Sequence, residues 1–302
     1  MRRIDINSRL KPYKASELIF SCMRSKLAYM NPKDLRASLK NKNTWDCTSA
    51  VCNPLLKNEV DRMFGTIVHD PIFYDGLEGS KKRDAQGFTI WNQKTIYVSY
   101  RGTCDIMDVF DNIDIRHTRI HKNIKVHKGF FDQFSSIEEK ITGDIKAISA
   151  EYPIERLVFT GHSLGTALAT ISAPYYGAMF KNRFRIIAHS LAGPPCGNID
   201  FVNWFSSNVD ENVRLEADGD IVPYIPIHDN FYHVPNGVLM KRDGTFVDQY
   251  DIKPYSYITI LAMLLNKNRW EQINYDHSCE NYITKLFSVG ACAPHNPLRS
   301  RE

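Results

Sequence analysis

The sequence predicts an α/β fold in which helices cover both faces of a mostly parallel central sheet. Short β-branched and aromatic segments alternate with segments of helical periodicity through the middle of the chain. Several of the short segments are apolar throughout, as strands buried on both faces are. The 302 residues are 43% hydrophobic and 24% charged, which is enough apolar material for one sizeable core. We therefore expect a single domain over 1–302, with a less distinctive helical portion at 1–80 and a frayed tail at 290–302.

The spacing of apolar residues predicts the elements of the first half. Apolar residues recur at helical spacing in 14–29, which predicts the first helix. The β-branched and aromatic segments 87–91 and 95–100 are separated by a short turn and predict two strands. Apolar residues at steps of three and four then predict a long amphipathic helix over 130–148.

The second half continues the same alternation. We expect a short buried strand at 157–160, followed after residue 165 by a helix of small residues. A strand at 184–189, a helix at 200–206 and a strand at 213–216 come next. Because parallel strands end at the same edge of a sheet, we expect a site at their carboxyl ends.

The segment 161–165 reads Gly-His-Ser-Leu-Gly and directly follows a predicted strand. Glycines on both sides of the serine let the neighbouring chain pass close to a tight turn between strand and helix. A serine hydroxyl needs such a rigid position and a neighbouring base to become a nucleophile. Ser163 is therefore the candidate nucleophile, and the alternative is a glycine-bracketed turn without chemistry. We predict that His162 points away from the serine and has a packing role.

The candidate acid lies at the end of a later strand, because the order on such a fold is serine, acid, histidine. Residues 214–223 supply two aspartates at one strand end. Asp220 is the candidate acid, since Gly219 lets the chain turn before it and an Ile-Val-Pro segment anchors it. Asp218 is interpreted as a turn former, a common role of aspartate.

Four histidines follow the candidate acid and could supply the base. They are His228, His233, His277 and His295. His228 is too near the acid in sequence to reach across the site, and His295 lies in the tail. His233 alternates like a strand residue, which favours a structural hydrogen bond. His277 lies on a polar loop before the helix-like segment 280–287 and is the candidate base, with His233 as the alternative.

An oxyanion intermediate needs two hydrogen-bond donors held in place before the reaction. The backbone N–H of Leu164, the residue after the nucleophile, is one candidate donor. Thr103 is the other, because it ends the loop after the strand 95–100 and offers both an N–H and a hydroxyl. The alternative is that Thr103 only caps the segment that follows it.

The ordered motifs between residues 84 and 282 resemble the class 3 lipase family, which includes fungal triacylglycerol lipases, plant acylhydrolases and diacylglycerol lipases. The motifs are Asp-Ala-Gln-Gly-Phe at 84–88, Val-Ser-Tyr-Arg-Gly-Thr at 98–103, Val-His-Lys-Gly-Phe at 126–130, Gly-His-Ser-Leu-Gly at 161–165, Ala-Gly-Pro-Pro-Cys-Gly-Asn at 192–198 and Asp-Ile-Val-Pro at 220–223. The resemblance implies an α/β-hydrolase fold and a catalytic triad of Ser163, Asp220 and His277. It also implies that Thr103 and Leu164 form the oxyanion hole.

The activity implied by the resemblance is hydrolysis of a lipid ester through an acyl-enzyme, without a metal or an organic cofactor. Two other functions remain open. One is an esterase or thioesterase for small soluble esters, and the other is a catalytically inactive lipase fold that serves as a binding protein. Loss of labelling by a fluorophosphonate would favour the inactive protein.

Two segments bear on how the chain would meet lipid. Residues 104–115 lie where family members often carry a lid, and they form either a lid or an ordinary core helix. The apolar segment 254–265 separates the candidate acid from the candidate base and has no counterpart in the family pattern. It either packs in the core or binds at a lipid interface.

Charge and cysteine usage bear on partners and location. The net charge of +4 comes from scattered Lys and Arg, which argues against nucleic acid and permits weak attraction to anionic membranes. Residues 1–20 lack an apolar core of signal-peptide length, and no apolar run approaches the roughly 20 residues of a spanning helix. Seven irregularly spaced cysteines fit a reducing compartment. We therefore expect a cytoplasmic protein, peripheral to a membrane or a lipid droplet, whose partner is a lipid ester.

Overall fold

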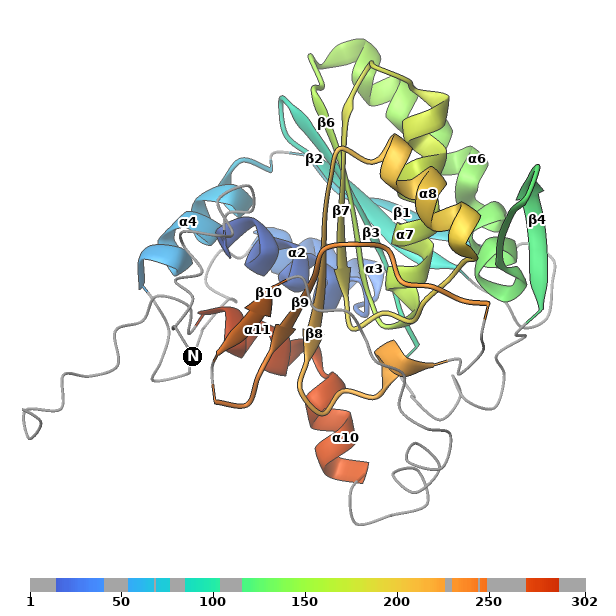
Figure 1. Cartoon of the computed structure of the whole chain (residues 1–302). Coiled ribbons are helices and arrows are strands. Elements are labelled where there is room, and N and C mark those ends of the chain that lie inside the picture. Colours follow the sequence, from blue (N-terminus) through green and yellow to red (C-terminus); the bar gives the residue numbers. More distant parts are fainter. Residues whose placement is uncertain are drawn as a thin grey trace, which may run out of the picture.

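An eight-stranded sheet with the strand order β1-β2-β3-β6-β7-β8-β9-β10 forms the centre of the protein in the computed structural model (Figure 1). A separate two-stranded sheet pairs β4 with β5. The structure describes residues 15–40, 54–67, 69–76, 85–103, 116–225, 230–243, 245–248 and 270–287. The strands are β1 Ile72–Asp75, β2 Gln86–Trp91, β3 Thr95–Tyr100, β4 His117–His121, β5 Ile124–His127, β6 Arg156–His162, β7 Arg185–Leu191, β8 Glu211–Ala217, β9 Gly237–Met240 and β10 Phe246–Asp248.

The five strands from β3 to β9 in the middle of the large sheet run parallel, and the outer strands β1, β2 and β10 pair antiparallel. Parallel neighbours need crossover connections, which bring helices onto the faces of the sheet. All five strands predicted from the sequence belong to this sheet. The predicted fold class, a mostly parallel sheet with helices on both faces, is therefore confirmed.

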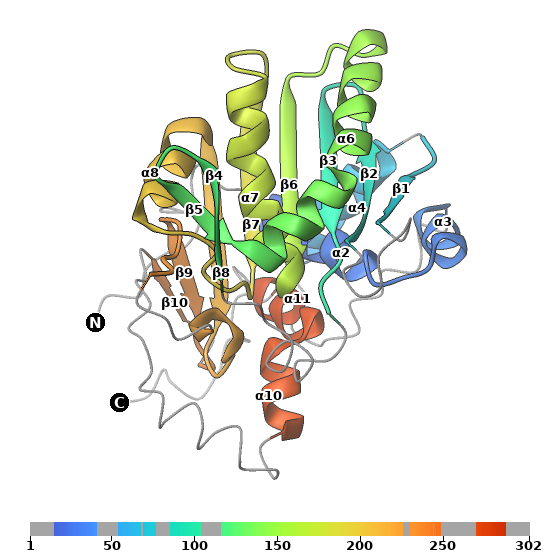
Figure 2. The ribbon, with the colours of Figure 1, turned by 90° about the vertical axis from the view of Figure 1, so that its right-hand side faces the viewer.

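Helices cover the sheet in two groups (Figures 1 and 2). The helices α6, α7 and α8 lie together on one face, and α2, α4 and α11 lie together on the other. A short 3-10 helix, η1, follows β8. The bounds are α2 Ala15–Leu27, α3 Pro32–Lys40, α4 Pro54–Gly65, α6 Lys128–Glu151, α7 Leu164–Met179, α8 Ile199–Asn208, η1 Val222–Tyr224, α10 Trp270–His277 and α11 Cys279–Phe287.

Side chains on opposite faces of the central strands enter two separate apolar cores. On β6, Leu157 and Phe159 pack with the buried side chains of α6 and α7, whereas Val158 packs with those of α2 and α11. This alternation follows from the two-residue period of a strand. Truncation of a fully buried aromatic side chain such as Phe159 would cost about 3–5 kcal/mol. The cores hold the carboxyl ends of β6 and β8 in fixed positions.

The longest helix, α6, confirms the amphipathic helix predicted over 130–148. Its buried side chains are Phe130, Phe134, Ile137, Ile141, Thr142, Ile145 and Ile148, which recur at steps of three and four. The helix α7 is buried along most of its length because small residues let it approach the sheet closely. This close packing places the beginning of α7 directly at the end of β6.

The portion predicted to be helical at 1–80 contains α2, α3 and α4, but it also supplies strand β1. That strand pairs antiparallel with β2, with Phe73 opposite Phe88. This strand was not predicted from the sequence, and it has only four residues, of which Tyr74 alone is buried. One domain over 1–302 remains a prediction. The lid segment 104–115, the apolar segment 254–265 and the tail 290–302 lie outside the described residues.

None of the helices that the structure describes combines the length and the apolar character needed to cross a membrane.

Candidate active site

Ser163 lies on the turn between β6 and α7, where the sequence predicts the nucleophile. Its backbone has φ 58° and ψ −130°, and a non-glycine residue at positive φ costs about 1–3 kcal/mol. Its N–H donates to the carbonyl of Leu191 at 3.0 Å, which fixes the turn against β7. A Cβ on Gly161 would collide with the backbone of Gly165, so this turn requires glycine. The hydrogen bond to Leu191 and the close approach at Gly161 therefore hold Ser163 in this strained conformation.

The hydroxyl of Ser163 is buried and unpaired. The residue is 1% exposed, and its Oγ has no hydrogen-bond partner among the described residues. A buried hydroxyl ordinarily finds a partner, because leaving it unsatisfied costs about 1–3 kcal/mol. An unpaired hydroxyl on a strained turn is typical of a group that is kept free for a reaction.

Asp220 and His277 lie together, as the sequence predicts for the acid and the base. Asp220 follows β8 after Gly219, whose φ of 96° makes the sharp turn possible. Both carboxylate oxygens lie 3.0 Å from His277 Nδ1. A carboxylate only accepts, so Nδ1 carries the proton and Nε2 presents its lone pair. His277 Nε2 is buried and has no hydrogen-bond partner among the described residues, which leaves it available as a base.

Two further donors hold the carboxylate of Asp220. The Tyr282 hydroxyl donates to Oδ2 at 2.8 Å, and the backbone N–H of Val222 donates to Oδ1 at 3.0 Å. The Tyr282 oxygen accepts in turn from the backbone N–H of Ala217 at 2.9 Å, which fixes the phenol. Burial, followed by the charge of Asp220, raises the pKa of Tyr282 well above its ordinary value, so the phenol remains a donor.

His277 is the last residue of α10, and the prediction that it lies on a polar loop is wrong. The helix buries only Ile273, Asp276 and His277, while Tyr275 is exposed. One aliphatic residue in eight gives no helical periodicity, so the sequence did not reveal the helix. Asp276 is held by Arg242 Nη2 at 2.8 Å, which ties the end of α10 to the segment after β9. The base is therefore positioned by a helix end, which is more rigid than a loop.

His162 makes two hydrogen bonds in addition to its packing contacts. Its Nε2–H donates to the backbone carbonyl of His277 at 2.5 Å, and its Nδ1 lies 3.0 Å from the Tyr29 hydroxyl, which donates to it. Burial, together with nearby His277, lowers the pKa of His162 well below its ordinary value and keeps the ring neutral. Because His162 immediately precedes Ser163, this contact connects the nucleophile turn to the helix that carries the base. The sequence predicted only packing for this residue.

The alternative base, His233, lies in a different environment. Its Nε2–H donates to the carbonyl of Pro223 at 2.7 Å. Burial, followed by the charge of Arg214, lowers its pKa well below the ordinary value. The hydrogen bond is the structural contact that the sequence favoured for this residue. Asp218 lies in the turn before Gly219, and its backbone N–H donates to Met240.

The loop after β3 lies against the nucleophile turn. A Cβ on Gly102 would come within 3.2 Å of Ser163 Cβ and closer still to the carbonyl of His162. Arg101 fixes this loop, because its N–H donates to the Gln86 carbonyl at 2.8 Å and its Nη1 donates to Gln86 Oε1 at 2.5 Å. Thr103 therefore lies close to the turn. Leu164 is the first residue of α7, where a backbone N–H has no partner within the helix.

A cavity of about 570 Å³ lies beside the base. Its lining combines the predicted residues Thr103 and His277 with residues from the end of α2, α10 and the start of α11. The lining residues are Lys26, Tyr29, Met30, Thr103, His162, Asn274, His277, Ser278, Cys279 and Glu280. Its size falls in the range of small-molecule sites. At its edge, Lys26 Nζ lies 2.8 Å from Glu280 Oε1.

Sequence reasoning missed Tyr29 and Tyr282, which act through His162 and Asp220. Tyr29 is the last residue of the first predicted helix, and Tyr282 lies in the helix-like segment 280–287. Both segments were predicted to be helical, and nothing in their spacing distinguishes a tyrosine that faces a site from one in the core. Their roles depend on contacts over more than 60 residues of chain.

Comparison with known proteins shows similarity to lipases. The profile of the family "Lipase (class 3)" matches residues 97–230. A lipase of Rhizomucor miehei is 24% identical over 188 residues, which cover 61% of this chain and 48% of that protein. A secreted mono- and diacylglycerol lipase of Fusarium solani is 28% identical over 136 residues, or 44% of this chain and 40% of that protein. The chain thus spans half or less of the length of these relatives.

A solved structure extends the likeness to nearly the whole chain. The triacylglyceride lipase of Rhizomucor miehei superposes with a TM-score of 0.61 at 17% identity, covering 93% of this chain and 99% of that one. At this identity the match bears on the fold. The profile match over residues 97–230 supports the class 3 lipase family that the motifs indicate, and the fold of the chain is that of the α/β-hydrolases.

Proposed function

We propose that the chain is a serine carboxylic ester hydrolase that cleaves acyl chains from lipid esters, namely triacylglycerol, diacylglycerol or phospholipid. One observation carries the proposal. His277 is hydrogen-bonded through Nδ1 to a buried carboxylate and has an unpaired Nε2, and His162 connects it to the strained turn of Ser163. This arrangement has the three parts of a Ser-His-Asp triad, in the chain order of the α/β-hydrolases.

In the first half of the reaction, the Oγ of Ser163 attacks the ester carbonyl while His277 Nε2 takes its proton. The carboxylate of Asp220 stabilises the imidazolium that forms. The N–H of Leu164 and the N–H or hydroxyl of Thr103 donate to the oxyanion. Collapse of the tetrahedral intermediate expels the alcohol, which takes the proton from Nε2, and leaves an acyl group on Ser163.

In the second half, water attacks the acyl-enzyme and gives one proton to His277 Nε2. Collapse of this second intermediate releases the carboxylic acid and returns the proton to Ser163 Oγ. The neutral state of His162 supports this cycle, because a second imidazolium beside His277 would oppose its protonation. No step uses a metal or an organic cofactor.

Lipid is favoured as the substrate class by the family. The matching profile is that of lipases, and the Fusarium solani relative is named a mono- and diacylglycerol lipase. The cavity of about 570 Å³ beside His277 is large enough to admit part of a lipid. Peripheral binding to a membrane or a lipid droplet, in the cytoplasm, is part of the proposal. The free thiols of Cys22, Cys196 and Cys279 are compatible with a reducing compartment.

A panel of esters tests the proposal. Purified protein would be assayed on emulsified triacylglycerol, diacylglycerol and phospholipid, and on a short soluble ester and a thioester, with Ser163→Ala as the blank. We expect turnover of at least one emulsified lipid and a rise in rate when the short ester exceeds its solubility and forms an interface. Liposome sedimentation with and without anionic lipid would measure the peripheral binding.

Two outcomes would replace the proposal. Equal rates below and above the solubility limit, with no lipid hydrolysis, would identify an esterase or a thioesterase for soluble substrates. Lipid binding without turnover of any ester, and without labelling by a fluorophosphonate, would identify an inactive lipase fold that binds its ligand.

A further inference from the structure

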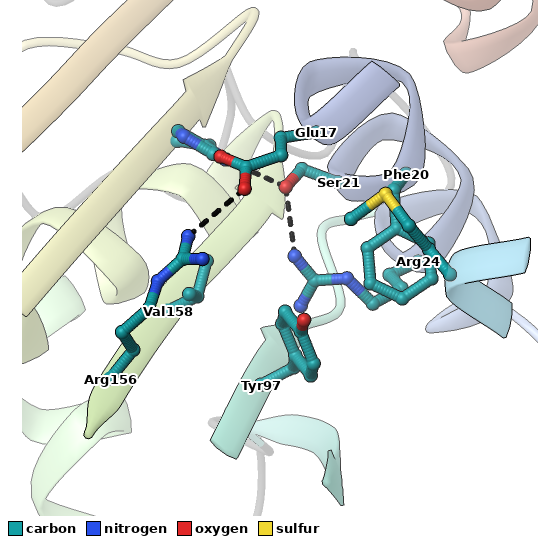
Figure 3. Close-up of a pocket in the computed structure, with 9 residues that line it drawn as sticks. Glu17, Phe20, Ser21, Arg24, Tyr97, Arg156 and Val158 are labelled. Carbon is teal, nitrogen blue, oxygen red and sulfur yellow. Dashed lines mark hydrogen bonds and ion pairs between the residues drawn. The ribbon is translucent and has the colours of Figure 1, made fainter. Parts of the chain in front are cut away.

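A second group of buried polar residues lies under α2, on the face of the sheet opposite α7 (Figure 3). Arg24 is 0% exposed, and its guanidinium carbon lies 4.8 Å from the ring centre of Phe20 and 4.6 Å from that of Tyr97. Its hydrogen bonds go to neutral hydroxyls. Nη2 donates to Ser21 Oγ at 2.8 Å, and Nη1 donates to Ser99 Oγ at 3.3 Å.

The charges around Arg24 do not balance. The nearby carboxylate of Glu17 lies 3.2 Å from Arg156 Nη2 and is paired with it. Two guanidinium groups therefore share one carboxylate. Burial lowers the pKa of Arg24 to about 9, which still leaves it charged at neutral pH. An uncompensated buried charge is strongly destabilising, so a counter-ion would stabilise this region.

The hydrogen bonds identify which kind of partner fits. Ser21 Oγ accepts from Arg24, so its hydroxyl donates to His189 Nδ1 at 2.7 Å. His189 therefore carries its hydrogen on Nε2, and burial, followed by the charges of Arg24 and Arg156, lowers its pKa to about 3. Three N–H groups have no acceptor among the described residues: His189 Nε2, Arg24 Nε and Arg156 Nε. All three unpaired atoms are donors.

The same residues line one small cavity, with room for a single particle of about the size of a water molecule. In Figure 3 the guanidinium groups of Arg24 and Arg156 extend toward each other from α2 and β6. The side chains of Arg156 and Glu17 are 31% and 20% exposed, so the cavity is reached from solvent at their edge. We infer that this cavity binds one small monovalent anion, such as chloride.

The hydrogen-bonding groups of the cavity suit a halide better than a water molecule. Water brings two donor hydrogens of its own, whereas the unpaired groups need an acceptor and the charge needs to be cancelled. A halide accepts from several N–H groups at once and neutralises the excess positive charge. The bound ion would join α2 to β6 and β7, which carry Arg156 and His189. Its expected effect is therefore on stability.

Thermal unfolding in matched salts tests the inference. The melting temperature of the wild type would be followed as sodium gluconate is replaced by sodium chloride or bromide at constant ionic strength. We expect a rise of ~2–4 °C when the halide exceeds its dissociation constant about tenfold, and a further logarithmic rise above that concentration. The variant Arg24→Met should lose the rise. The control Arg183→Met, at an exposed arginine in the turn between α7 and β7, should keep it.

Diffraction data from crystals of the wild type soaked in bromide provide a test that needs no variant. We expect an anomalous peak between Arg24, Arg156 and His189. A cavity that holds only water in those data would overturn the inference. So would a melting temperature that responds equally to gluconate and halide, or a halide response of the same size in Arg24→Met as in the wild type.

Discussion

The candidate active site and the cavity under α2 both bury polar atoms that have no hydrogen-bond partner among the described residues, and they differ in which atoms those are. At the carboxyl ends of β6 and β8, the unpaired atoms are the hydroxyl of Ser163 and the Nε2 lone pair of His277. In the small cavity under α2, the unpaired atoms are the N–H donors of Arg24, Arg156 and His189. The first region has one unpaired hydroxyl and one unpaired basic nitrogen, the latter beside a large cavity, and the second has donors alone around a small cavity.

The chemical type of an unsatisfied buried group indicates which function it fits. A hydroxyl and a basic nitrogen that are both free can exchange a proton, so their free state fits catalysis. Donors alone cannot exchange a proton among themselves, and their free state fits the binding of an acceptor. The hydrogen bonds of the neighbours reinforce this distinction, because Asp220 accepts from three partners whereas Arg24 donates only to hydroxyls.

The largest expected effect comes from the base. His277→Ala removes the proton acceptor and should lower kcat by at least ~10³-fold, because the members of a triad act as a unit. His233→Ala is the matched control. It leaves the Pro223 carbonyl without its donor and should cost about 1–3 kcal/mol of stability with little loss of turnover. Turnover rates and melting temperatures of both variants show which histidine is the base. An inactive His233→Ala together with an active His277→Ala would identify His233 as the base.

The contact between the two parts of the site predicts a smaller effect. His162→Phe keeps an aromatic ring but removes the hydrogen bond to the His277 carbonyl. We expect kcat to fall ~10²-fold with little change in KM, because the base is displaced relative to Ser163. His162→Gln, which can still donate, should recover part of the rate. Unchanged kcat in His162→Phe would show that the ring only packs, as the sequence suggested.

Loss of one donor to the acid should have a milder effect still. Tyr282→Phe removes the 2.8 Å hydrogen bond to Asp220 and keeps the packing of the ring. One hydrogen bond to a charged group contributes about 1.5–3 kcal/mol, so we expect kcat/KM to fall between ~10-fold and ~10²-fold. Tyr275→Phe, at an exposed tyrosine of α10, is the control and should be neutral. Equal effects of the two changes would exclude a role for the Tyr282 hydroxyl.

The region under α2 predicts an effect on stability that depends on pH. The pKa of His189 is about 3 in the folded protein and about 6.5 in an unfolded chain. Between these values the unfolded state binds the additional proton, so stability falls as the pH falls. Above pH ~7 the contribution of His189 to the free energy of unfolding no longer changes with pH. His189→Gln should flatten the slope by up to about 1.4 kcal/mol per pH unit, measured by denaturant unfolding from pH 4 to 8. An unchanged slope would mean that His189 is not buried as a neutral ring.

The parts of the fold that the sequence predicts are those with local patterns. Apolar spacing reveals α6, and β-branched segments reveal β3 and β6. The turn at Ser163 is recognisable from its glycines: Gly161 is required by the nearby backbone of Gly165, and Gly165 by the backbone of Tyr100 and Arg101 at the end of β3. The strands β9 and β10 have only four and three residues, and β9 joins the sheet through parallel pairing with β8, with Arg214 opposite Gly237, which has no local signal.

The candidate site likewise contains residues that sequence patterns predict and residues that they do not. The order of motifs points to Asp220 and His277, but the helix that carries His277 has one aliphatic residue and could not be recognised from periodicity. The partners Tyr29 and Tyr282 become visible only when α2 and α11 pack beside the site. Arg24 lies within an apolar helical pattern, and its burial on α2 is opposite to the exposure expected of arginine.

The identity of the nucleophile is tested most directly by labelling with a fluorophosphonate, followed by mass spectrometry of the labelled peptide. A fluorophosphonate forms a covalent bond only with a serine that a neighbouring base activates. We expect one label per chain, on Ser163, and no label in Ser163→Ala. In His277→Ala the rate of labelling should be at least ~10³-fold slower. A label on another residue, or full labelling of Ser163→Ala, would contradict it.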